Sequence, residues 1–572
     1  MTGSPLDWTA DGQPRSRLFG DVYFSAEDGL AETRAVFLDG CGVPDAWAGR
    51  RRFVVAELGF GTGLNIAALL DLWRRTGPPG GQLHVFTVEG FPIAADEAAR
   101  ALARWPEIAQ AAQALTRRWP GRARGVHRLE IPEFSAVVDV AVGDVAEALA
   151  GWTGRADAWF LDGFSPALNP QMWSDEILAL VGARSAPGAR AATFTVAGQV
   201  RRGLAAAGFS VEKRPGFGRK RERLEARFPG EPQDASSRRV AIVGGGVAGA
   251  AAARAVRALG GEAVVFEADA PGAGGSGNPA ALVTPRLDAG LGAPAQLFAR
   301  AFARAVQLCR ALPQAIITEG VLQLATADRD LPRYEKIAAS DLFEPGELTV
   351  LSAAEAAERL GEPAPAALDQ RSALVVEPAV LLEAWAGETR RTRVANIRDL
   401  DADAVIVAAA LGSRALLPDL PLKPVRGQAS WAPAQHFAAA AAWGGYVLPT
   451  RDGVLFGATH DRDDEAVDLR ADDHRRNRET LARALPGLAT RLADAILDGR
   501  ASVRATTPDR LPIAGTTRDG IHVLTGFGSR GFSLAPLLAE HVAAQALGAP
   551  SPLPAAAQAL VDPARFARRA RS

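Results

Sequence analysis

Two runs of consecutive apolar residues, one in each half of the chain, stand out against the mixed pattern around them. The first spans Phe53–Ala56 and the second spans Val240–Val243. Short apolar runs of this kind are typical of parallel strands buried on both faces. Each run leads into a glycine-rich turn and then a helical pattern, at 66–75 and 250–258. Nearer the start, alternating aromatic residues at 19–25 predict a short hairpin followed by a helix. The pattern therefore predicts an α/β chain with two strand–turn–helix units.

The turn in the middle of the chain has the spacing of a dinucleotide-binding fingerprint. Gly244, Gly246 and Gly249 follow the apolar run, and the next predicted strand ends in Glu267. The first glycine allows the tight turn, the second lets backbone N–H groups approach a pyrophosphate, and the third lets helix and strand pack closely. The acid at the end of the next strand binds ribose hydroxyls. We interpret this stretch as a dinucleotide site, with a purely structural glycine turn as the alternative.

The glycine turn in the first half has a different order, because its acid comes two residues before the first glycine. The acid, the glycines and the residue before the helix are Glu57, Gly59, Gly61, Gly63 and Asn65. This order is typical of class I methyltransferases, in which the turn passes under the amino-acid part of S-adenosylmethionine. We therefore predict a methyl-donor site in the first half.

Two further acids follow later strands of the first half. The predicted strand Leu83–Val88 ends in Glu89, which is placed to bind both ribose hydroxyls of the methyl donor. Asp144 lies where such folds use an acid to accept the adenine amino group. The alternative for Asp144 is an ordinary N-cap of the next helix.

The predicted strand Ala158–Leu161 delivers the best catalytic candidate of the first half, Asp162. Ligands of open α/β sheets bind at the carboxyl ends of strands, so we expect Asp162 to face the donor methyl group. A carboxylate can orient an attacking amine or accept its proton. Phe164, two residues later, can form a wall for the target. The alternative is that Asp162 only caps the turn that follows.

Two segments of small residues in the second half suit a loop pressed against a large flat cofactor. The residues of the first segment, within 272–281, are Gly274, Ser276 and Asn278. The residues of the second segment, before the final predicted helix, are Gly526, Gly528, Ser529 and Gly531. A flexible linker is the alternative for the first segment. A nucleotide fold that is interrupted by a substrate domain and closed by a glycine turn is the layout of flavin oxidoreductases of the D-amino-acid-oxidase type.

Length and composition constrain the domain organisation and the class of protein. A chain of 572 residues can form two domains, each with its own core. The polar segment Pro229–Ser237 predicts a boundary between domains at 1–235 and 236–572. No apolar run approaches the roughly 20 residues of a membrane helix and the start lacks a signal core, so we expect a cytoplasmic protein. Cys41 and Cys309 have no metal-ligand spacing, and we expect neither a metal site nor a disulfide.

The charge balance bears on polyanionic partners. The net charge is −1, which gives no general attraction to a polyanion, so such a partner would need a local basic patch. Two stretches of the first half, Arg117–Arg128 and Lys213–Arg227, are rich in Lys and Arg, and the second runs into the predicted linker. They are candidate RNA-binding stretches, with an ordinary solvated surface as the alternative.

The order of these motifs resembles that of the MnmC family, the bifunctional enzymes of 5-methylaminomethyl-2-thiouridine biosynthesis in tRNA. The segments that carry the resemblance are Asp21–Ser25 with Gly29–Arg34, Glu57–Asn65, Asp162–Pro166 with Asn169–Trp173, Gly244–Gly249, Gly274–Asn278 and Gly526–Gly531. The resemblance implies a class I S-adenosylmethionine methyltransferase domain at 1–235. At 236–572 it implies an FAD-binding Rossmann domain of the D-amino-acid-oxidase type with an inserted α+β substrate domain.

The resemblance also implies two reactions on the wobble uridine (U34) of tRNA. The C-terminal half would use FAD to remove the carboxymethyl group from 5-carboxymethylaminomethyl-(2-thio)uridine, and the N-terminal half would then methylate the resulting amine. In the related glycine and D-amino-acid oxidases, arginines lie on the substrate side, and the matching positions here are Arg504 and Arg530. Arg426 is a third candidate. A guanidinium suits a substrate carboxylate because it binds in a bidentate manner, and a structural salt bridge is the alternative for each arginine.

Two other functions are compatible with the motifs. One is a fused amine oxidase and N-methyltransferase that acts on free small-molecule amines. The other is a non-enzymatic FAD-binding sensor with a degenerate methyltransferase module, although the intact Asp162, Arg504 and Arg530 argue against decay. With the family resemblance, we expect a monomer that binds tRNA and needs no metal.

Overall fold

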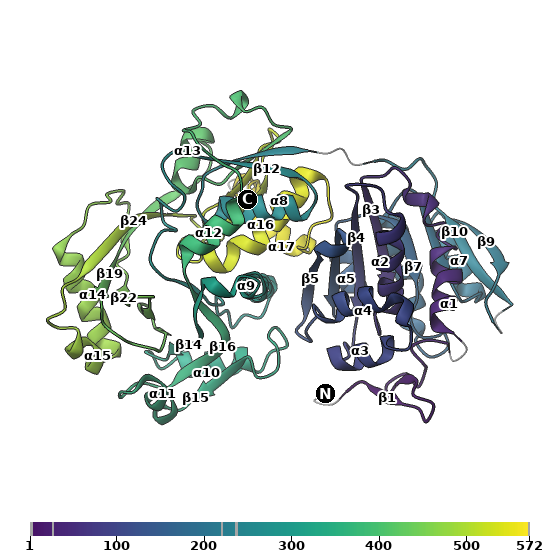
Figure 1. Cartoon of the computed structure of the whole chain (residues 1–572), viewed down its shortest axis with the longest axis horizontal. Helices are drawn as coiled ribbons and strands as arrows, with labels where there is room; N and C mark the ends of the chain where they lie inside the picture. Colours follow the sequence, from purple (N-terminus) through teal and green to yellow (C-terminus); the bar gives the residue numbers. More distant parts are fainter. Residues whose placement is uncertain (1–3, 26–27, 219–220, 235–237, 570–572) are drawn as a thin grey trace. The chain divides into compact units, whose positions relative to one another are not determined.

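The computed structural model describes residues 4–25, 28–218, 221–234 and 238–569 (Figure 1). These residues form two compact units. The first unit takes the described residues of 1–237, 258–260 and 547–555, and the second takes those of 238–257, 261–546 and 556–572. The predicted boundary at residue 235 and the end of the predicted linker, 235–237, lie outside the described residues.

The first unit is built around an eight-stranded sheet with the order β5-β6-β4-β3-β7-β8-β10-β9. The neighbouring pairs from β6 to β8 are parallel, and β5, β10 and β9 are antiparallel to their neighbours. The strands are β3 (Arg52–Leu58), β4 (Gln82–Glu89), β5 (Gly125–Ile131), β6 (Ala136–Val142), β7 (Ala156–Leu161), β8 (Ser185–Thr193), β9 (Ser210–Pro215) and β10 (Glu222–Arg227). The order β4-β3-β7 brings the carboxyl ends of three strands to adjacent positions at one edge.

Helices cover both faces of this sheet, because the side chains on both faces of its central strands are apolar. Phe53 and Val55 of β3 share one core cluster with residues of α2, α3 and α4, whereas Val54 and Leu58 share another with residues of α5, α6 and α7. The helices are α1 (Gly29–Thr33), α2 (Leu64–Thr76), α3 (Ala95–Leu102), α4 (Ala109–Thr116), α5 (Val145–Gly151), α6 (Asp175–Ala183) and α7 (Gly198–Ala206). The sheet is therefore the middle layer of an α/β/α unit.

The hairpin predicted at 19–25 lies elsewhere in the structure. Strand β1 (Leu6–Trp8) pairs with β2 (Pro14–Ser16), and Val22 of the predicted segment forms an isolated bridge with Arg15. The helix expected after it is present as α1 and continues as a π-helix at Arg34–Leu38. The aromatic residues of 19–25 instead pack beside the methyl-donor turn, as described below.

The stretch Lys213–Arg227, predicted as a basic rim running into a linker, contributes to the edge strand β9 and to its neighbour β10. In β10 the buried residues Leu224 and Ala226 alternate with charged ones. This two-residue period is the signal of a half-buried strand, and the density of charges concealed it. Arg219 and Lys220 lie outside the described residues.

The second unit contains two sheets. The first, with the order β17-β12-β11-β18-β26-β25, is parallel except for its β26–β25 pair. Its strands are β11 (Arg239–Val243), β12 (Glu262–Glu267), β17 (Thr389–Arg391), β18 (Ala404–Val407), β25 (Ile513–Thr516) and β26 (His522–Thr525). The second sheet is mostly antiparallel and forms the inserted part of the unit. Its strands are β13 (Ala281–Val283), β14 (Ile316–Leu324), β15 (Leu348–Leu351), β16 (Ala367–Val376), β19 (Lys423–Pro433), β20 (Ala441–Ala442), β21 (Tyr446–Pro449), β22 (Gly453–Gly457), β23 (Asp461–Arg462) and β24 (Asp498–Thr506).

The main helices of the second unit begin with α8 (Val247–Ala258), which follows the central glycine turn. The others are α9 (Ala293–Arg310), α10 (Asp330–Ala338), α11 (Ala353–Leu360), α12 (Pro378–Ala386), α13 (Ser413–Leu416), α14 (Ala471–Ala484), α15 (Pro486–Arg491), α16 (Gly531–Leu547), α17 (Ala555–Val561) and α18 (Arg565–Arg569). Throughout the described part of the chain, no helix combines the length and apolar character that a membrane crossing requires.

Candidate functional site

The methyl-donor turn connects β3 to α2 at the edge where β4, β3 and β7 end. Gly59, Gly61 and Gly63 have φ angles of +89°, +52° and +76°, a region that favours glycine. A Cβ on Gly63 would also lie 2.9 Å from the side chain of Leu115 and 3.1 Å from that of Trp119. Backbone conformation and packing therefore both require glycine at this position.

Asn65 joins the two acids predicted on either side of it. Its amide donates hydrogen bonds of 2.7 Å to Asp162 Oδ2 and 3.0 Å to Glu57 Oε1. The carbonyl oxygen of Asn65 accepts a bond of 2.8 Å from the hydroxyl of Thr33, which fixes the direction of the amide. Asp162 Oδ1 accepts a bond of 2.8 Å from the backbone N–H of Gly163. The predicted turn-capping role thus occupies one oxygen of Asp162, and the other is oriented by Asn65.

Glu57 is a buried carboxyl at the centre of this network. Burial raises its pKa to about 8, and the nearby charge of Asp162 acts in the same direction. Hydrogen bonds from Thr87 and Asn65 oppose the shift without reversing it. Glu57 is therefore mostly protonated at neutral pH and adds little negative charge to the site.

We expect Glu57→Gln to flatten the pH dependence of the first unit's stability. The folded pKa of about 8 exceeds the usual 4.5, so the folded unit binds a proton more tightly between these values. The contribution of Glu57 is fully present below about pH 4.5 and is lost as the pH rises to about 8, by at most about 1.4 kcal/mol per pH unit. Across this pH window, the free energy of unfolding of the variant should rise relative to that of the parent.

Denaturant unfolding followed by tryptophan fluorescence tests this expectation, because most tryptophans of the chain lie in the first unit. Free energies of unfolding would be compared for parent and variant at several pH values between about 5 and 8. Thr76→Val, an exposed helix-end change, serves as the control. Parallel pH profiles for parent and Glu57→Gln would contradict the assigned protonation state.

The two predicted nucleotide-binding acids of the first unit have different local partners. Glu89 Oε2 accepts a hydrogen bond of 2.8 Å from the N–H of Gly61, and Oε1 accepts one of 2.8 Å from that of Phe91. Burial raises the pKa of Glu89. Asp144 Oδ1 caps helix α5 by accepting bonds of 2.9 Å and 3.0 Å from the N–H groups of Ala146 and Glu147. The alternative role of Asp144 as an N-cap is thus present, and its contact with adenine stays a prediction.

Phe164 belongs to an aromatic group beside the methyl-donor turn. Its ring lies 4.9 Å from that of Phe19 and 5.3 Å from that of Tyr23, centroid to centroid. Phe19 also contacts the ring of Phe91 at 6.0 Å. Phe19 and Tyr23, which were expected in a hairpin, therefore help to form a wall next to Asp162 and Glu89.

Two glycines of the second unit's fingerprint, Gly244 and Gly249, lie where a side chain would not fit. A Cβ on Gly244 would lie 2.6 Å from the carbonyl oxygen of Ala408, and one on Gly249 would lie 1.8 Å from that of Gly244. The Glu267 carboxylate accepts a bond of 2.6 Å from the N–H of Gly245, which orients it towards the turn. Ser276 Oγ accepts a bond of 3.0 Å from the N–H of Val247, at the start of α8. The predicted loop at 274–278 is therefore fixed beside the predicted pyrophosphate position.

Arg500 holds the small-residue loop in place. Its guanidinium donates to the carbonyl oxygens of Gly272, Ala273 and Gly274 at 3.2, 2.6 and 2.6 Å, and it contacts Asn278 Oδ1 at 3.5 Å. The loop is thus anchored to strand β24 and is not a free linker. Strand β24 also carries Arg504, so it connects the cofactor loop to the candidate substrate side.

The C-terminal glycine turn lies next to the same strand. Gly526 and Gly528 have φ angles of +78° and +56°, and the N–H of Gly528 donates to the carbonyl of Ala505 at 2.9 Å. Ser529 is exposed, and Gly531 opens helix α16. This turn therefore brings Arg530 to the part of the unit where β24 ends.

Arg504 and Arg530 hydrogen-bond to backbone carbonyls and have no carboxylate partner among the described residues. Arg504 donates to the carbonyls of Thr459 and Arg426 at 3.2 and 3.5 Å, and Arg530 donates to that of Pro285 at 3.2 Å. Burial lowers the pKa of both, to about 10 for Arg530, where neighbouring arginines contribute. The charge of Asp461 also acts on Arg504, but Asp461 is itself paired with Arg476 at 2.8 Å. Two partly buried cations that lack a direct carboxylate partner are suited to bind a substrate carboxylate.

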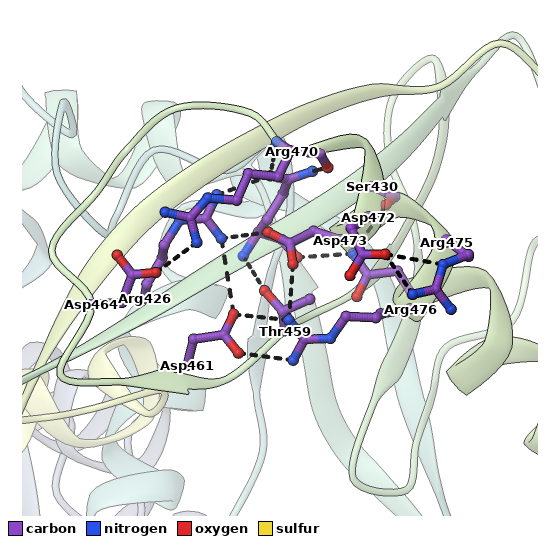
Figure 2. A network of polar contacts seen from close by, with 12 residues as sticks. Arg426, Ser430, Thr459, Asp461, Asp464, Arg470, Asp472, Asp473, Arg475 and Arg476 are labelled. Carbon is purple, nitrogen blue, oxygen red and sulfur yellow. Dashed lines mark hydrogen bonds and ion pairs between the residues drawn. The ribbon is translucent and has the colours of Figure 1, made fainter.

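Arg426 is already neutralised and is the structural salt bridge named as its alternative. Its guanidinium is completely buried, pairs with Asp473 and donates to the carbonyl of Asp468 at 2.6 Å (Figure 2). Asp473 also pairs with Arg476 at 2.9 Å. The side chain of Arg426 therefore has no capacity for a substrate, and its backbone carbonyl instead supports Arg504.

Sequence reasoning missed several residues that shape these sites. They are Thr33, Thr87, Arg500 and Tyr446; Thr87 donates to Glu57 at 2.7 Å, and Tyr446 lies close enough to Arg504 for their charges to interact. Thr33 lies in the segment Gly29–Arg34 that matches the family, but nothing in the sequence assigned a role to its hydroxyl. The other three belong to no glycine motif and follow none at a fixed spacing, so no local signal marked them. Among the described residues, no group of three or more metal-ligating side chains gathers.

Comparisons with known proteins assign both units. A model of S-adenosyl-L-methionine-dependent methyltransferases matches residues 106–229, and a model of FAD dependent oxidoreductases matches residues 239–545. The L-proline dehydrogenase of P. horikoshii shares the fold, with a TM-score of 0.50 and 17% identity over 59% of this chain and 99% of that one. The predicted fold class and the predicted cofactors, S-adenosylmethionine and FAD, are thereby confirmed.

Curated relatives match almost the whole length of the chain. A "tRNA 5-methylaminomethyl-2-thiouridine biosynthesis bifunctional protein MnmC" from Caulobacter sp. (strain K31) is 59% identical over 99% of this chain and 98% of its own. The protein of the same name from Caulobacter vibrioides is 59% identical over 98% of both chains. The chain therefore belongs to the MnmC family of bifunctional proteins, which combine a methyltransferase with an FAD-dependent oxidoreductase.

Proposed function

We propose that this protein modifies the wobble uridine (U34) of tRNA in two steps. The second unit removes the carboxymethyl group from 5-carboxymethylaminomethyl-(2-thio)uridine, and the first unit methylates the amine that results. The names of the relatives support tRNA as the substrate. One observation carries the proposal: the chain has an oriented carboxylate, Asp162, in its first unit and two guanidinium groups without a carboxylate partner, Arg504 and Arg530, in its second.

The residues of the second unit match a substrate that has both a carboxylate and a secondary amine. FAD would be held by Gly244, Gly246, Gly249, Glu267 and the loops at 274–278 and 526–531. Bound FAD accepts a hydride from the substrate carbon next to the amine. Arg504 and Arg530 would bind the carboxylate and so hold that carbon in a fixed position. Water then hydrolyses the oxidised substrate to glyoxylate and a primary amine.

The residues of the first unit match a primary amine as the second substrate. S-adenosylmethionine, which supplies the methyl group, would be held by Glu57, Asn65, Glu89 and Asp144. An amine attacks only in its neutral form, so Asp162 Oδ2 would orient it and accept its proton. Phe164 and the neighbouring rings would enclose the flat base.

The order of the steps follows from the chemistry of the groups. The arginines of the second unit require the carboxymethyl group, and methylation requires the free amine that remains once this group has left. The two units would thus act in sequence on one nucleotide. We propose domains at 1–235 and 236–572 for these activities, which the two compact units support. Cytoplasmic location agrees with a role in tRNA modification, and the monomeric state stays a prediction.

Transfer RNA that lacks the final modification tests this proposal. With FAD and oxygen but no methyl donor, the full-length protein should convert carboxymethylaminomethyl-uridine in tRNA to the aminomethyl form. Addition of S-adenosylmethionine should then yield the methylaminomethyl form, as read by mass spectrometry of the nucleosides. Free small amines serve as the competing substrates, and turnover of these amines without turnover of tRNA would favour the fused small-molecule enzyme instead.

A further inference from the structure

The two basic stretches of the first unit offer little free positive charge. Most of their described cations pair with nearby acids: Arg117 and Arg118 with Glu133, Arg124 with Glu147, Arg128 with Asp139, Lys213 with Glu222, Arg214 with Glu212, and Arg223 with Glu225. Paired surface charges attract a phosphate weakly, because its binding would break an existing ion pair. A phosphate-binding site therefore has to be sought among arginines that lack acidic partners.

Such arginines gather around residues 285–287 of the second unit. Arg530 donates to the carbonyl of Pro285 at 3.2 Å, and Arg333 donates to the carbonyl of Leu287. Arg286 lies between these two positions in the chain and donates to the carbonyl of Arg510 at 2.8 Å. Backbone carbonyls thus hold three guanidinium groups and bring the fourth arginine, Arg510, beside them.

The charges of this group are poorly balanced. The positive charges of Arg510 and Arg333 lower the pKa of Arg286, after the larger effect of burial, and Arg286 and Arg333 likewise act on Arg530. Two acids face the group, Asp288 and Asp509. Asp509 is already paired with Arg565 at 2.9 Å, and the single charge of Asp288 balances only one of the four arginines. A net positive charge therefore remains at this place.

The exposure of the four arginines differs in a systematic way. Arg286 and Arg530 are partly buried, whereas Arg333 and Arg510 are exposed. Arg530 belongs to the candidate carboxylate site, so the group extends from that site to the surface. A small free amino acid has one carboxylate, which the partly buried arginines would bind. The exposed Arg333 and Arg510 would then have no ligand.

We propose that Arg286, Arg333 and Arg510 form a binding site for the backbone phosphates of the nucleotide whose base enters the second unit. The proposal rests on tRNA as the substrate and adds the residues that distinguish a polynucleotide from a free amine. A guanidinium held by one backbone carbonyl keeps further N–H groups for a phosphate oxygen, in the fork geometry that phosphate prefers. The turn that carries Arg510 is fixed by the Asp509–Arg565 ion pair, so this donor is placed before the substrate arrives.

Substitution of the two exposed arginines tests the site in the full-length protein. Arg333→Gln and Arg510→Gln, singly and together, would be assayed on hypomodified tRNA and on the free nucleoside 5-carboxymethylaminomethyluridine, which has no phosphate. We expect the ratio of the KM for tRNA to the KM for the nucleoside to rise about 10-fold in the double variant. The slope of log KM for tRNA against log salt should fall by about 0.7 for each lost phosphate contact.

Three controls keep the outcomes distinct. Arg475→Gln removes another exposed arginine, whose charge is balanced by Asp472 and Glu479, and it should leave the ratio and the slope unchanged. Flavin absorbance reports whether each variant is folded, and Arg333→Lys with Arg510→Lys should recover most of the salt slope because it keeps the charge. An unchanged slope and ratio in folded Gln variants would overturn the site, while a parent protein inactive on tRNA would overturn the proposed function itself.

Discussion

Asp162→Asn is expected to lower the rate of methyl transfer by about 10²- to 10⁴-fold, the usual contribution of a positioned acid–base group. Asparagine keeps the shape of the side chain but cannot accept the proton of the attacking amine. The substitution also places a second amide opposite Asn65, whose N–H group now donates to Asp162 Oδ2 at 2.7 Å. FAD-dependent oxidation should continue at the parental rate, because Asp162 belongs to the first unit.

Nucleoside analysis of hypomodified tRNA after incubation with both cofactors measures this effect. The variant should accumulate the aminomethyl form, whereas the parent proceeds to the methylaminomethyl form. Asp175→Asn, at the first residue of helix α6 in the same unit, is a control of the same chemical type. Methylation by Asp162→Asn at the parental rate would show that another group receives the proton.

Arg504→Met is expected to lower kcat/KM for the oxidative step by about 100-fold or more. The loss of one partner from a buried, hydrogen-bonded charge pair costs about 2–5 kcal/mol, and each 1.4 kcal/mol is a factor of about ten. Arg504→Lys should recover only part of this loss, since lysine keeps the charge without the bidentate fork. Methyl transfer to a substrate that is already aminomethylated should be unaffected by either change.

The glycine under Arg504 provides a second route to the same defect. A Cβ on Gly427 would lie 2.1 Å from Nη1 of Arg504, so Gly427→Ala should displace the guanidinium while keeping its charge. Arg390→Met, at an exposed arginine that pairs with Glu388, is the matched control. If folded Arg504→Met and Gly427→Ala proteins oxidise tRNA at the parental kcat/KM, the carboxylate is bound by other residues.

Features that depend on neighbouring residues could be predicted from the sequence. Gly63 and Gly244 lie in turns whose geometry excludes a Cβ, and this requirement appears in the sequence as a glycine at a fixed distance from a strand. Glu89 is the last residue of β4 and Asp162 directly follows β7. Their shared position at one edge follows from the rule that parallel strands end on the same side. For these residues, the local sequence pattern is enough to predict where they lie in the folded unit.

Features that depend on distant partners could not be predicted. Thr33 orients Asn65 from 32 positions away in the sequence. Arg500 hydrogen-bonds to the loop at 272–274, which lies more than 220 positions before it. Arg426 and Arg504 were both candidates to bind the substrate carboxylate. Only the ion pair of Arg426 with Asp473 shows that Arg426 is already neutralised. The basic stretches show the same limit, because a count of charges does not reveal which acid pairs with each arginine, and their role in RNA binding stays a prediction.

The Asp509–Arg565 ion pair makes the second unit sensitive to the loss of helix α18 (Arg565–Arg569). Arg565 begins the short helix α18, and it holds both oxygens of Asp509 and the carbonyl of Leu511. Loss of this helix would remove Arg565 and free the turn around Arg510, while the cofactor motifs would stay in the chain. Partly degraded preparations would then stay yellow and folded while they discriminate poorly between tRNA and small amines, so colour alone is a misleading measure of intact enzyme.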